Sequence, residues 1–136
     1  MSCTTNNVKI RVLLIDDEPH VLLAISSILW SRGHYVKTFD NTGSALEHLA
    51  GETVQYDSVI TDYRMPGGIS GLDLAKTVKK HARKIKVSLM TAFDISCLLD
   101  FSEALQSEIV NEVLQKPIPN NKLIAIIEKS FLRNHH

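Results

Sequence analysis

Five side chains suited to binding a charged, oxygen-rich group follow apolar runs in this 136-residue sequence. They are Asp16, Asp17, Asp62, Thr91 and Lys116. If the three carboxylates share one pocket they repel each other, and without a cation the pKa of at least one is expected to rise. A hard divalent cation relieves this repulsion, and an all-oxygen, partly hydrated site suits Mg²⁺. These carboxylates therefore predict a magnesium site.

Lys116 and Thr91 extend the predicted chemistry beyond metal binding. The ammonium of Lys116 can pair with Asp62 or with an oxygen of a group attached to Asp62. Thr91 offers a hydroxyl donor to the same group. Phosphoryl transfer requires a multiply charged oxyanion to be held beside its acceptor, and an aspartate can act as the nucleophile to give an acyl phosphate. We therefore expect Asp62 to accept a phosphoryl group.

The elements that would position these residues alternate along the chain. Short β-type runs are predicted at residues 8–15, 34–39, 56–61, 85–90 and 109–114. Helical spacing of apolar residues predicts helices at 21–30, 42–50, around 72–78, from 95 to about 106, and at 120–132. Strands alternating with helices predict an α/β fold, with one parallel sheet covered on both faces and right-handed crossovers. The most continuous apolar runs, 12–15, 58–61 and 87–90, should form the central strands.

The predicted fold brings the polar residues together. In a flavodoxin-like doubly wound five-stranded sheet of order 2-1-3-4-5, ligands bind outside the carboxyl ends of the strands, where the order reverses between strands one and three. Asp16 and Asp17 end the first strand and Asp62 ends the third. Thr91 and Lys116 follow the fourth and fifth strands. All five residues are therefore expected at one edge of the sheet.

Each of these residues alone also has an ordinary structural interpretation. Asp16 and Asp17 could cap the helix that follows. Asp62 could belong to a turn and Thr91 could cap a strand end. Lys116 could be a surface lysine. The joint placement of all five at one sheet edge favours the functional interpretation.

The composition limits the class of protein. Hydrophobic residues make up 44% of the chain and charged residues 22%, which together with its length indicates a single packed domain. Fifteen basic residues balance fifteen acidic ones, which argues against a dedicated nucleic-acid surface. The basic run at 79–86 is interpreted as a solvated helix face. The histidines at 20, 34, 48 and 81 lack metal-ligand spacing, so solvated or capping roles are expected.

The cysteines and the chain ends give the remaining expectations. Cys3 and Cys97 provide no disulfide framework, so reduced thiols and a cytoplasmic location are expected. No apolar run approaches the ~18 residues of a membrane span. Residues 1–7 lack the features of a signal peptide and are interpreted as a disordered leader. Residues 134–136 are interpreted as a tail, either native or a tag remnant.

Four motifs carry a family resemblance. They are LIDDEP at 14–19, ITDYRMP at 60–66, MTA at 90–92 and QKP at 115–117. In this order, each at a predicted strand end, they resemble the receiver domain of bacterial two-component response regulators, over roughly residues 9–132. The domain itself is assigned to residues 8–133.

The resemblance implies a role for each site residue. Asp62 resembles the acceptor of a phosphoryl group from the phosphohistidine of a sensor histidine kinase, and the implied partner is such a kinase or a phosphotransfer protein. Asp16 and Asp17 resemble the metal pair, with Asp17 the direct Mg²⁺ ligand and Asp16 acting through water. The backbone carbonyl of Arg64 would complete the protein's share of the metal shell.

The same resemblance covers the residues around the phosphoryl group. Thr91 resembles the switch hydroxyl that moves toward that group. Lys116 resembles the phosphoryl-binding lysine, and the Lys116–Pro117 bond is expected to be cis, as in the family. The resemblance implies a signalling switch rather than a turnover enzyme. Its output would pass through the face of the fourth helix, fifth strand and fifth helix, by dimerisation or by contact with an output domain.

The sequence departs from the family pattern on the output side. Val113 stands where the family usually has an aromatic rotamer switch, so the signal could travel by a backbone shift of strands four and five instead. The loop after Pro66 and the stretch 92–110 are longer than usual. The surplus of apolar residues at 95–105 indicates either a partner surface or a more deeply packed helix.

Three other functions compete with the switch. A phosphohydrolase with an aspartyl phosphate would need a second carboxylate two residues after the nucleophile, and Arg64 stands there. An interaction module that keeps the fold without phosphorylation is disfavoured by the full acidic pocket, although Val113 in place of the aromatic switch leaves this alternative open. Flavin binding is disfavoured because no phosphate-cradling loop follows the first strand.

Overall fold

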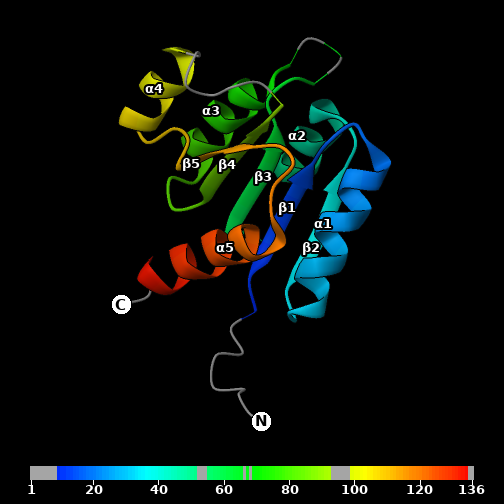
Figure 1. Cartoon of the computed structure of the whole chain (residues 1–136). Helices are drawn as coiled ribbons and strands as arrows, with labels where there is room; N and C mark the ends of the chain where they lie inside the picture. The colour runs from blue at the N-terminus through cyan, green and yellow to red at the C-terminus, as the bar shows by residue number, and fades with distance from the viewer. Residues whose placement is uncertain (1–8, 52–54, 66, 68, 93–98, 135–136) are drawn as a thin grey trace.

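The protein is an open parallel sheet with helices on both faces, as the computed structural model shows (Figure 1). The structure describes residues 9–51, 55–65, 67, 69–92 and 99–134. The predicted disordered leader, the start of the predicted fourth helix at 95–98 and the last two residues of the predicted tail lie outside these residues.

Five strands form the sheet in the order β2-β1-β3-β4-β5. They are β1 (Arg11–Ile15), β2 (Tyr35–Phe39), β3 (Ser58–Asp62), β4 (Lys86–Thr91) and β5 (Glu112–Gln115). All neighbouring pairs are parallel. The predicted flavodoxin-like order and the three central strands, β1, β3 and β4, are confirmed. Every residue of β3 is buried, as expected for a strand covered on both faces.

Five helices connect and cover the strands. They are α1 (Pro19–Ser31), α2 (Thr42–Gly51), α3 (Gly71–His81), α4 (Leu99–Gln106) and α5 (Asn120–Asn134). Pro19 occupies the first turn of α1, where its missing N–H is not needed. A capping box begins α3: the Ser70 hydroxyl accepts the Asp73 N–H, and the Asp73 carboxylate accepts the Ser70 N–H.

The sheet separates two apolar cores. Alternate residues of β1 point to opposite faces. Val12 and Leu14 therefore pack with residues of α1 and α5, whereas Leu13 and Ile15 pack with residues of α2, α3 and α4. Leu14 and Ile15, the last two residues of β1, belong to opposite cores and directly precede Asp16. Among the described residues, no helix has the length and apolar character needed to cross a membrane.

Lys79 corrects the interpretation of the basic run as a solvated helix face. Its side chain is 8% exposed, and its Nζ donates to the carbonyl of Glu108 at 3.0 Å and to Oδ1 of Asn111 at 2.8 Å. Burial lowers the pKa of Lys79 to about 8. The last turn of α3 faces the α4–β5 turn, whose acceptors require a donor, and Lys79 provides it.

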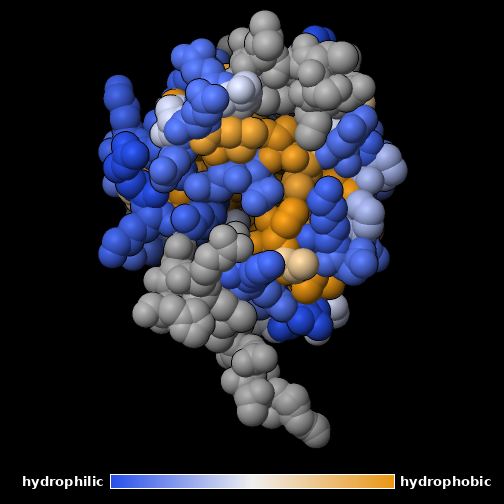
Figure 2. Space-filling model, turned by 60° about the vertical axis from the view of Figure 1, so that its left-hand side comes forward, coloured by the Kyte–Doolittle hydropathy of each residue, from blue (hydrophilic) through white to orange (hydrophobic). Residues whose placement is uncertain are grey.

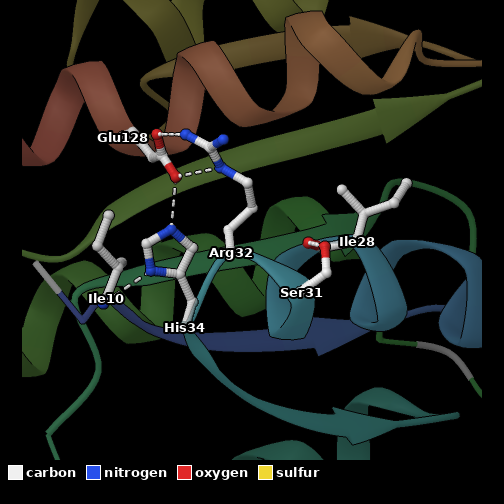
Figure 3. Close-up of polar contacts among 6 residues, drawn as sticks. All are labelled: Ile10, Ile28, Ser31, Arg32, His34 and Glu128. Carbon is white, nitrogen blue, oxygen red and sulfur yellow. Dashed lines mark hydrogen bonds and ion pairs between the residues drawn. The ribbon is translucent and has the colours of Figure 1, made fainter. Parts of the chain in front are cut away.

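His34 corrects the expectation of a solvated histidine (Figure 3). The side chain is buried, and its Nδ1 accepts the backbone N–H of Ile10 at 3.1 Å. The proton therefore sits on Nε2, which donates to Oε2 of Glu128 at 2.7 Å. Arg32 donates to the same carboxylate through Nη2 at 2.6 Å and Nε at 3.0 Å. This group, the Glu128 cluster, joins α5 to the start of β1 and to the α1–β2 connection.

His48 is also not solvated, because its Nε2 lies 2.6 Å from the hydroxyl of Tyr56. The expectation of solvated or capping histidines is therefore wrong for His34 and His48. His20 and His81 are exposed, in agreement with it.

Candidate functional site

The three carboxylates gather at the carboxyl ends of β1 and β3. These neighbouring strands pair in parallel with Ile15 opposite Thr61, so the residues that follow, Asp16 and Asp62, reach the same edge. Asp16, Asp17 and Asp62 each offer an oxygen, and these oxygens lie within 4.8 Å of one another. Within the described part of the chain, no other cluster of carboxylate, histidine or cysteine ligands is comparably close. The predicted acidic pocket is confirmed as a geometric cluster.

The two aspartates after β1 have different environments. Asp16 is fully buried, and its Oδ1 accepts the backbone N–H of Glu18 at 2.9 Å. Its Oδ2 accepts the ammonium of Lys116 at 2.7 Å. Asp17 is exposed at the mouth of the cluster. A cation approaching from solvent would therefore find the oxygens of Asp17 more accessible than those of Asp16.

Lys116 enters the pocket from the loop after β5. Its Nζ lies 3.4 Å from Oδ2 of Asp62 and 3.7 Å from Oε1 of Glu18, in addition to its contact with Asp16. The side chain is 17% exposed. The Lys116–Pro117 peptide is cis, as expected. The predicted pairing of Lys116 with Asp62 is confirmed, but the contact with Asp16 is shorter.

The electrostatics of the pocket follow from burial and charge. Burial, followed by the charge of Asp16, raises the pKa of Asp62 to about 6, and Lys116 only partly opposes this. Burial lowers the pKa of Lys116, but its hydrogen bond with Asp16 and the charges of Asp16 and Asp62 outweigh burial, so the net shift is upward. The pKa of Asp62 is thus raised as expected, but burial contributes more to the rise than the expected repulsion between carboxylates.

Thr91 and Arg64 lie at or just after the carboxyl ends of β4 and β3. Thr91 is buried at the end of β4, and its backbone carbonyl accepts the N–H of Lys116 at 2.7 Å. This bond links the backbones of Thr91 and Lys116, the two residues expected to contact a phosphoryl group. Arg64 lies in the loop two residues after Asp62, with an exposed side chain. The N–H of Tyr63, between them, donates to the carbonyl of Met90 at 2.8 Å and holds this loop against β4.

Gly71 belongs to the site although sequence reasoning did not select it. A Cβ at this position would overlap the carbonyl oxygen of Asp62 and lie 3.1 Å from Cα of Tyr63. The Gly71 N–H donates to the Tyr63 carbonyl at 2.9 Å. The first residue of α3 is thus packed directly on the backbone of Asp62. The sequence did offer one signal for this contact, because Gly71 directly precedes the helical pattern that begins at Leu72.

The fold and pocket define a class: a flavodoxin-like domain with a three-carboxylate, one-lysine pocket at its topological switch point. Comparison with known families gives the particular assignment. A sequence model described as "Response regulator receiver domain" matches residues 12–128. The chain therefore belongs to the response regulator receiver domains of two-component systems.

Curated relatives are similar over most of this chain. The transcriptional regulatory protein FixJ of Bradyrhizobium diazoefficiens is 29% identical over 122 residues, which cover 89% of this chain and 56% of FixJ. The sensor histidine kinase GacS of Pseudomonas protegens is 28% identical over 124 residues, covering 88% of this chain and 13% of GacS. The chain thus spans about half or less of the length of these relatives.

Solved structures give the same assignment. A response regulator receiver domain from Clostridium thermocellum is 28% identical with a TM-score of 0.80, over 93% of this chain and 97% of that chain. The response regulator TrrA from Thermotoga maritima, in complex with Mg²⁺-BeF, is 30% identical with a TM-score of 0.74, over 90% of this chain and 99% of TrrA. Receiver domains of this family signal by phosphorylation and bind Mg²⁺ at an acidic pocket.

Proposed function

We propose that Asp62 accepts a phosphoryl group from the phosphohistidine of a sensor histidine kinase and that this chain acts as a switch. One observation carries the proposal. The Asp62 carboxylate lies within 4.8 Å of two further carboxylates and 3.4 Å from the ammonium of Lys116. The ammonium of Lys116 can neutralise a phosphoryl group on Asp62 directly, and the carboxylates can hold a cation that does the same.

The proposed Mg²⁺ ligands are Asp17 and Asp62 directly, Asp16 through water, and the backbone carbonyl of Arg64. The exposure of Asp17 and the engagement of both Asp16 oxygens support this division. Burial, followed by the charge of Asp16, raises the pKa of Asp62, and a hard cation here would favour the ionised carboxylate against both effects. When bound, Mg²⁺ would supply charge neutralisation at the phosphoryl oxygens.

In the proposed transfer, one oxygen of Asp62 attacks the phosphorus as the phosphorus–nitrogen bond of the donor breaks. The electron pair of that bond leaves with the donor imidazole. The ammonium of Lys116 then turns from Asp16 to a phosphoryl oxygen, a short movement because it already lies between Asp16 and Asp62. The hydroxyl of Thr91 donates to another phosphoryl oxygen.

The proposed output is the face formed by α4, β5 and α5. Figure 2 shows this side of the molecule, where apolar side chains form a continuous strip between polar and charged ones. Leu105 of α4 is 40% exposed, and Val113 of β5 is partly exposed. We propose that this face contacts an output domain or a second copy. A movement of Thr91 toward the phosphoryl group would reach β5 through the backbone hydrogen bond between Lys116 and Thr91. In β5, Val113 stands where the family usually has an aromatic switch.

Arg64 supports a switch over a turnover enzyme, because it offers no carboxylate to act as general acid two residues after Asp62. The proposed receiver domain comprises residues 8–133.

Phosphorylation by a small-molecule donor tests the proposal. The protein is incubated with acetyl phosphate, with Mg²⁺ or with a chelator, and its intact mass is measured. We expect the mass of one phosphoryl group to appear with Mg²⁺ and to be lost in Asp62→Asn. Asp40→Asn, which changes an exposed carboxylate outside the pocket, should behave as the wild type. Equal uptake by wild type and Asp62→Asn, or none by either, would refute the proposal.

A further inference from the structure

The outward face of α1 exposes two large apolar side chains, beside serines and the exposed His20 near its start. Leu23 is 65% exposed and Trp30 is 52% exposed. They are seven positions apart, so they lie on the same side of the helix, about two turns from each other. Ser27, also exposed, lies between them. In Figure 1, α1 lies at the edge of the molecule, and no other helix or strand of the described residues lies on its outer side.

The same helix carries no fixed charge. Residues Pro19–Ser31 contain no Asp, Glu, Lys or Arg, whereas each of the other four helices contains at least one. The charged residues at its two ends already have partners within the chain. Glu18 lies 3.7 Å from Lys116, and Arg32 is bound to Glu128 (Figure 3). A charged partner would lose hydration on this face without gaining a counter-ion. The complementary surface is therefore an uncharged one.

The pattern of side-chain size fits a second α1 helix. We propose that two copies of this chain associate through α1, packed antiparallel about a twofold axis at Ser27. In that register Trp30 of each copy covers Ala24 of the other, and Leu23 lies beside Ser31 of the other. Large side chains thus meet small ones on both sides of the axis. A twofold interface needs such a self-complementary patch, and exposed Trp and Leu are suited to its centre.

A phosphoryl donor accounts for this face less well than a second copy. The donor must reach Asp62 at the carboxyl edge of the sheet, where α1 begins. Trp30 lies eleven residues after Pro19, roughly 16 Å farther along the helix axis. Contact with the donor would explain an apolar residue near the start of α1 but not Trp30. In the antiparallel pair, by contrast, both Leu23 and Trp30 contact the second copy.

The proposal is tested by placing a charged residue at position 27, where the proposed twofold axis passes. Sedimentation velocity of the unphosphorylated protein, from about 1 µM to about 500 µM, measures self-association. Fluorescence of Trp30, the single tryptophan, reports its burial over the same range. We expect the wild type to associate, with a blue shift of Trp30 emission. Ser27→Lys and Ser27→Glu each place two like charges together and should weaken association about 100-fold or more. A mixture of the two variants should associate again.

Two controls separate this surface from the others. Leu105→Lys on α4 should leave association unchanged, which distinguishes α1 from the proposed output face. Phosphoryl uptake from acetyl phosphate by both Ser27 variants should match the wild type, which shows that the pocket is intact and that the two proposals fail independently. A wild type that stays monomeric, Ser27 variants that associate normally, or a mixture that stays monomeric would each overturn the inference. A monomeric wild type whose Trp30 emission shifts with a histidine kinase domain would assign the face to that partner instead.

Discussion

The ammonium of Lys116 lies 2.7 Å from Oδ2 of Asp16 and 3.4 Å from the nearer oxygen of Asp62. Asp16 is fully buried, so the lysine neutralises the carboxylate that has least access to water. A cation entering the cluster would be attracted to the same oxygens and repelled by the ammonium. Lys116 and Mg²⁺ are therefore expected to compete for Asp16, and a phosphoryl group on Asp62 would relieve the competition by giving Lys116 another partner.

Replacing Lys116 should separate metal binding from phosphorylation. We expect Lys116→Met to bind Mg²⁺ about tenfold more tightly, because a positive charge beside the carboxylates is removed. Phosphorylation by acetyl phosphate should become slower, because the phosphoryl oxygens lose a charged donor. Isothermal titration and intact mass measure the two effects. Lys122→Met, on the exposed part of α5, should change neither. Unchanged or weaker Mg²⁺ binding in Lys116→Met would contradict the competition.

The pKa of Asp62 predicts a pH-dependent stability. Because the pKa is raised from 3.8 to about 6 in the folded state, the folded protein binds more protons than the unfolded chain between these values. The free energy of unfolding therefore falls as pH rises through this window. With a chelator at about pH 7.5, Asp62→Asn should be more stable than wild type by on the order of 1 kcal/mol. Most of the gain should disappear near pH 3.5, which lies below the unfolded-state pKa of 3.8, because Asp62 is then mostly protonated in both states.

Urea denaturation at the two pH values measures this difference, with Asp40→Asn as the control. Saturating Mg²⁺ should reverse the order of the two proteins near neutral pH, because the ion stabilises the wild type through binding. If Asp62→Asn is less stable than the wild type near neutral pH without Mg²⁺, the pKa of Asp62 is not raised in the folded protein.

Gly71 should be intolerant of even one methyl group. In Gly71→Ala the new Cβ would overlap the carbonyl of Asp62, so α3 or the strand end must move. We expect a loss of about 1–3 kcal/mol in unfolding free energy and slower phosphorylation, because Asp62 is displaced. Gly51→Ala, at a helical glycine with open space around its Cβ position, is the matched control. Normal phosphoryl uptake by Gly71→Ala would show that this contact does not position Asp62.

The sheet order and the pocket could be predicted because both depend on local patterns. Apolar runs and helical spacing identify the elements, and the parallel α/β architecture then brings all strand ends to one edge. The fifth strand was predicted too early, at 109–114, and β5 begins at Glu112. Ile109 and Val110 both donate their N–H to the carbonyl of Ala104. Apolar residues in a packed turn therefore looked like the start of a strand.

The buried polar contacts could not be predicted from local patterns. His34 and Glu128 are 94 positions apart, and Lys79 meets acceptors 29 and 32 positions away. His34 and Lys79 were expected to be solvated, because nothing near them in the chain indicates a buried partner. The preference of Lys116 for Asp16 over Asp62 was missed for a related reason: it depends on the relative positions of three charges within one pocket.

The Glu128 cluster predicts acid sensitivity at the end of the sheet opposite the pocket. Hydrogen bonding to Arg32 lowers the pKa of Glu128, and His34 adds to the shift, although burial opposes it. A carboxyl group whose pKa is lowered on folding stabilises the protein above its unfolded value of 4.5, and this contribution is lost as pH falls through the folded value. We expect Glu128→Gln to reduce the free energy of unfolding by about 1–2 kcal/mol at neutral pH.

Urea denaturation of wild type and Glu128→Gln, from neutral pH to about pH 3.5, should show this difference shrinking with acid, because a protonated Glu128 resembles glutamine. Glu47→Gln, an exposed substitution on α2, should show no comparable difference at any pH. Hydrogen exchange should also speed up at the Ile10 amide in Glu128→Gln, because His34, which accepts that N–H, loses the carboxylate that fixes its tautomer. If the stability difference between Glu128→Gln and wild type stays constant with pH, the cluster owes its effect to packing rather than to the charge of Glu128.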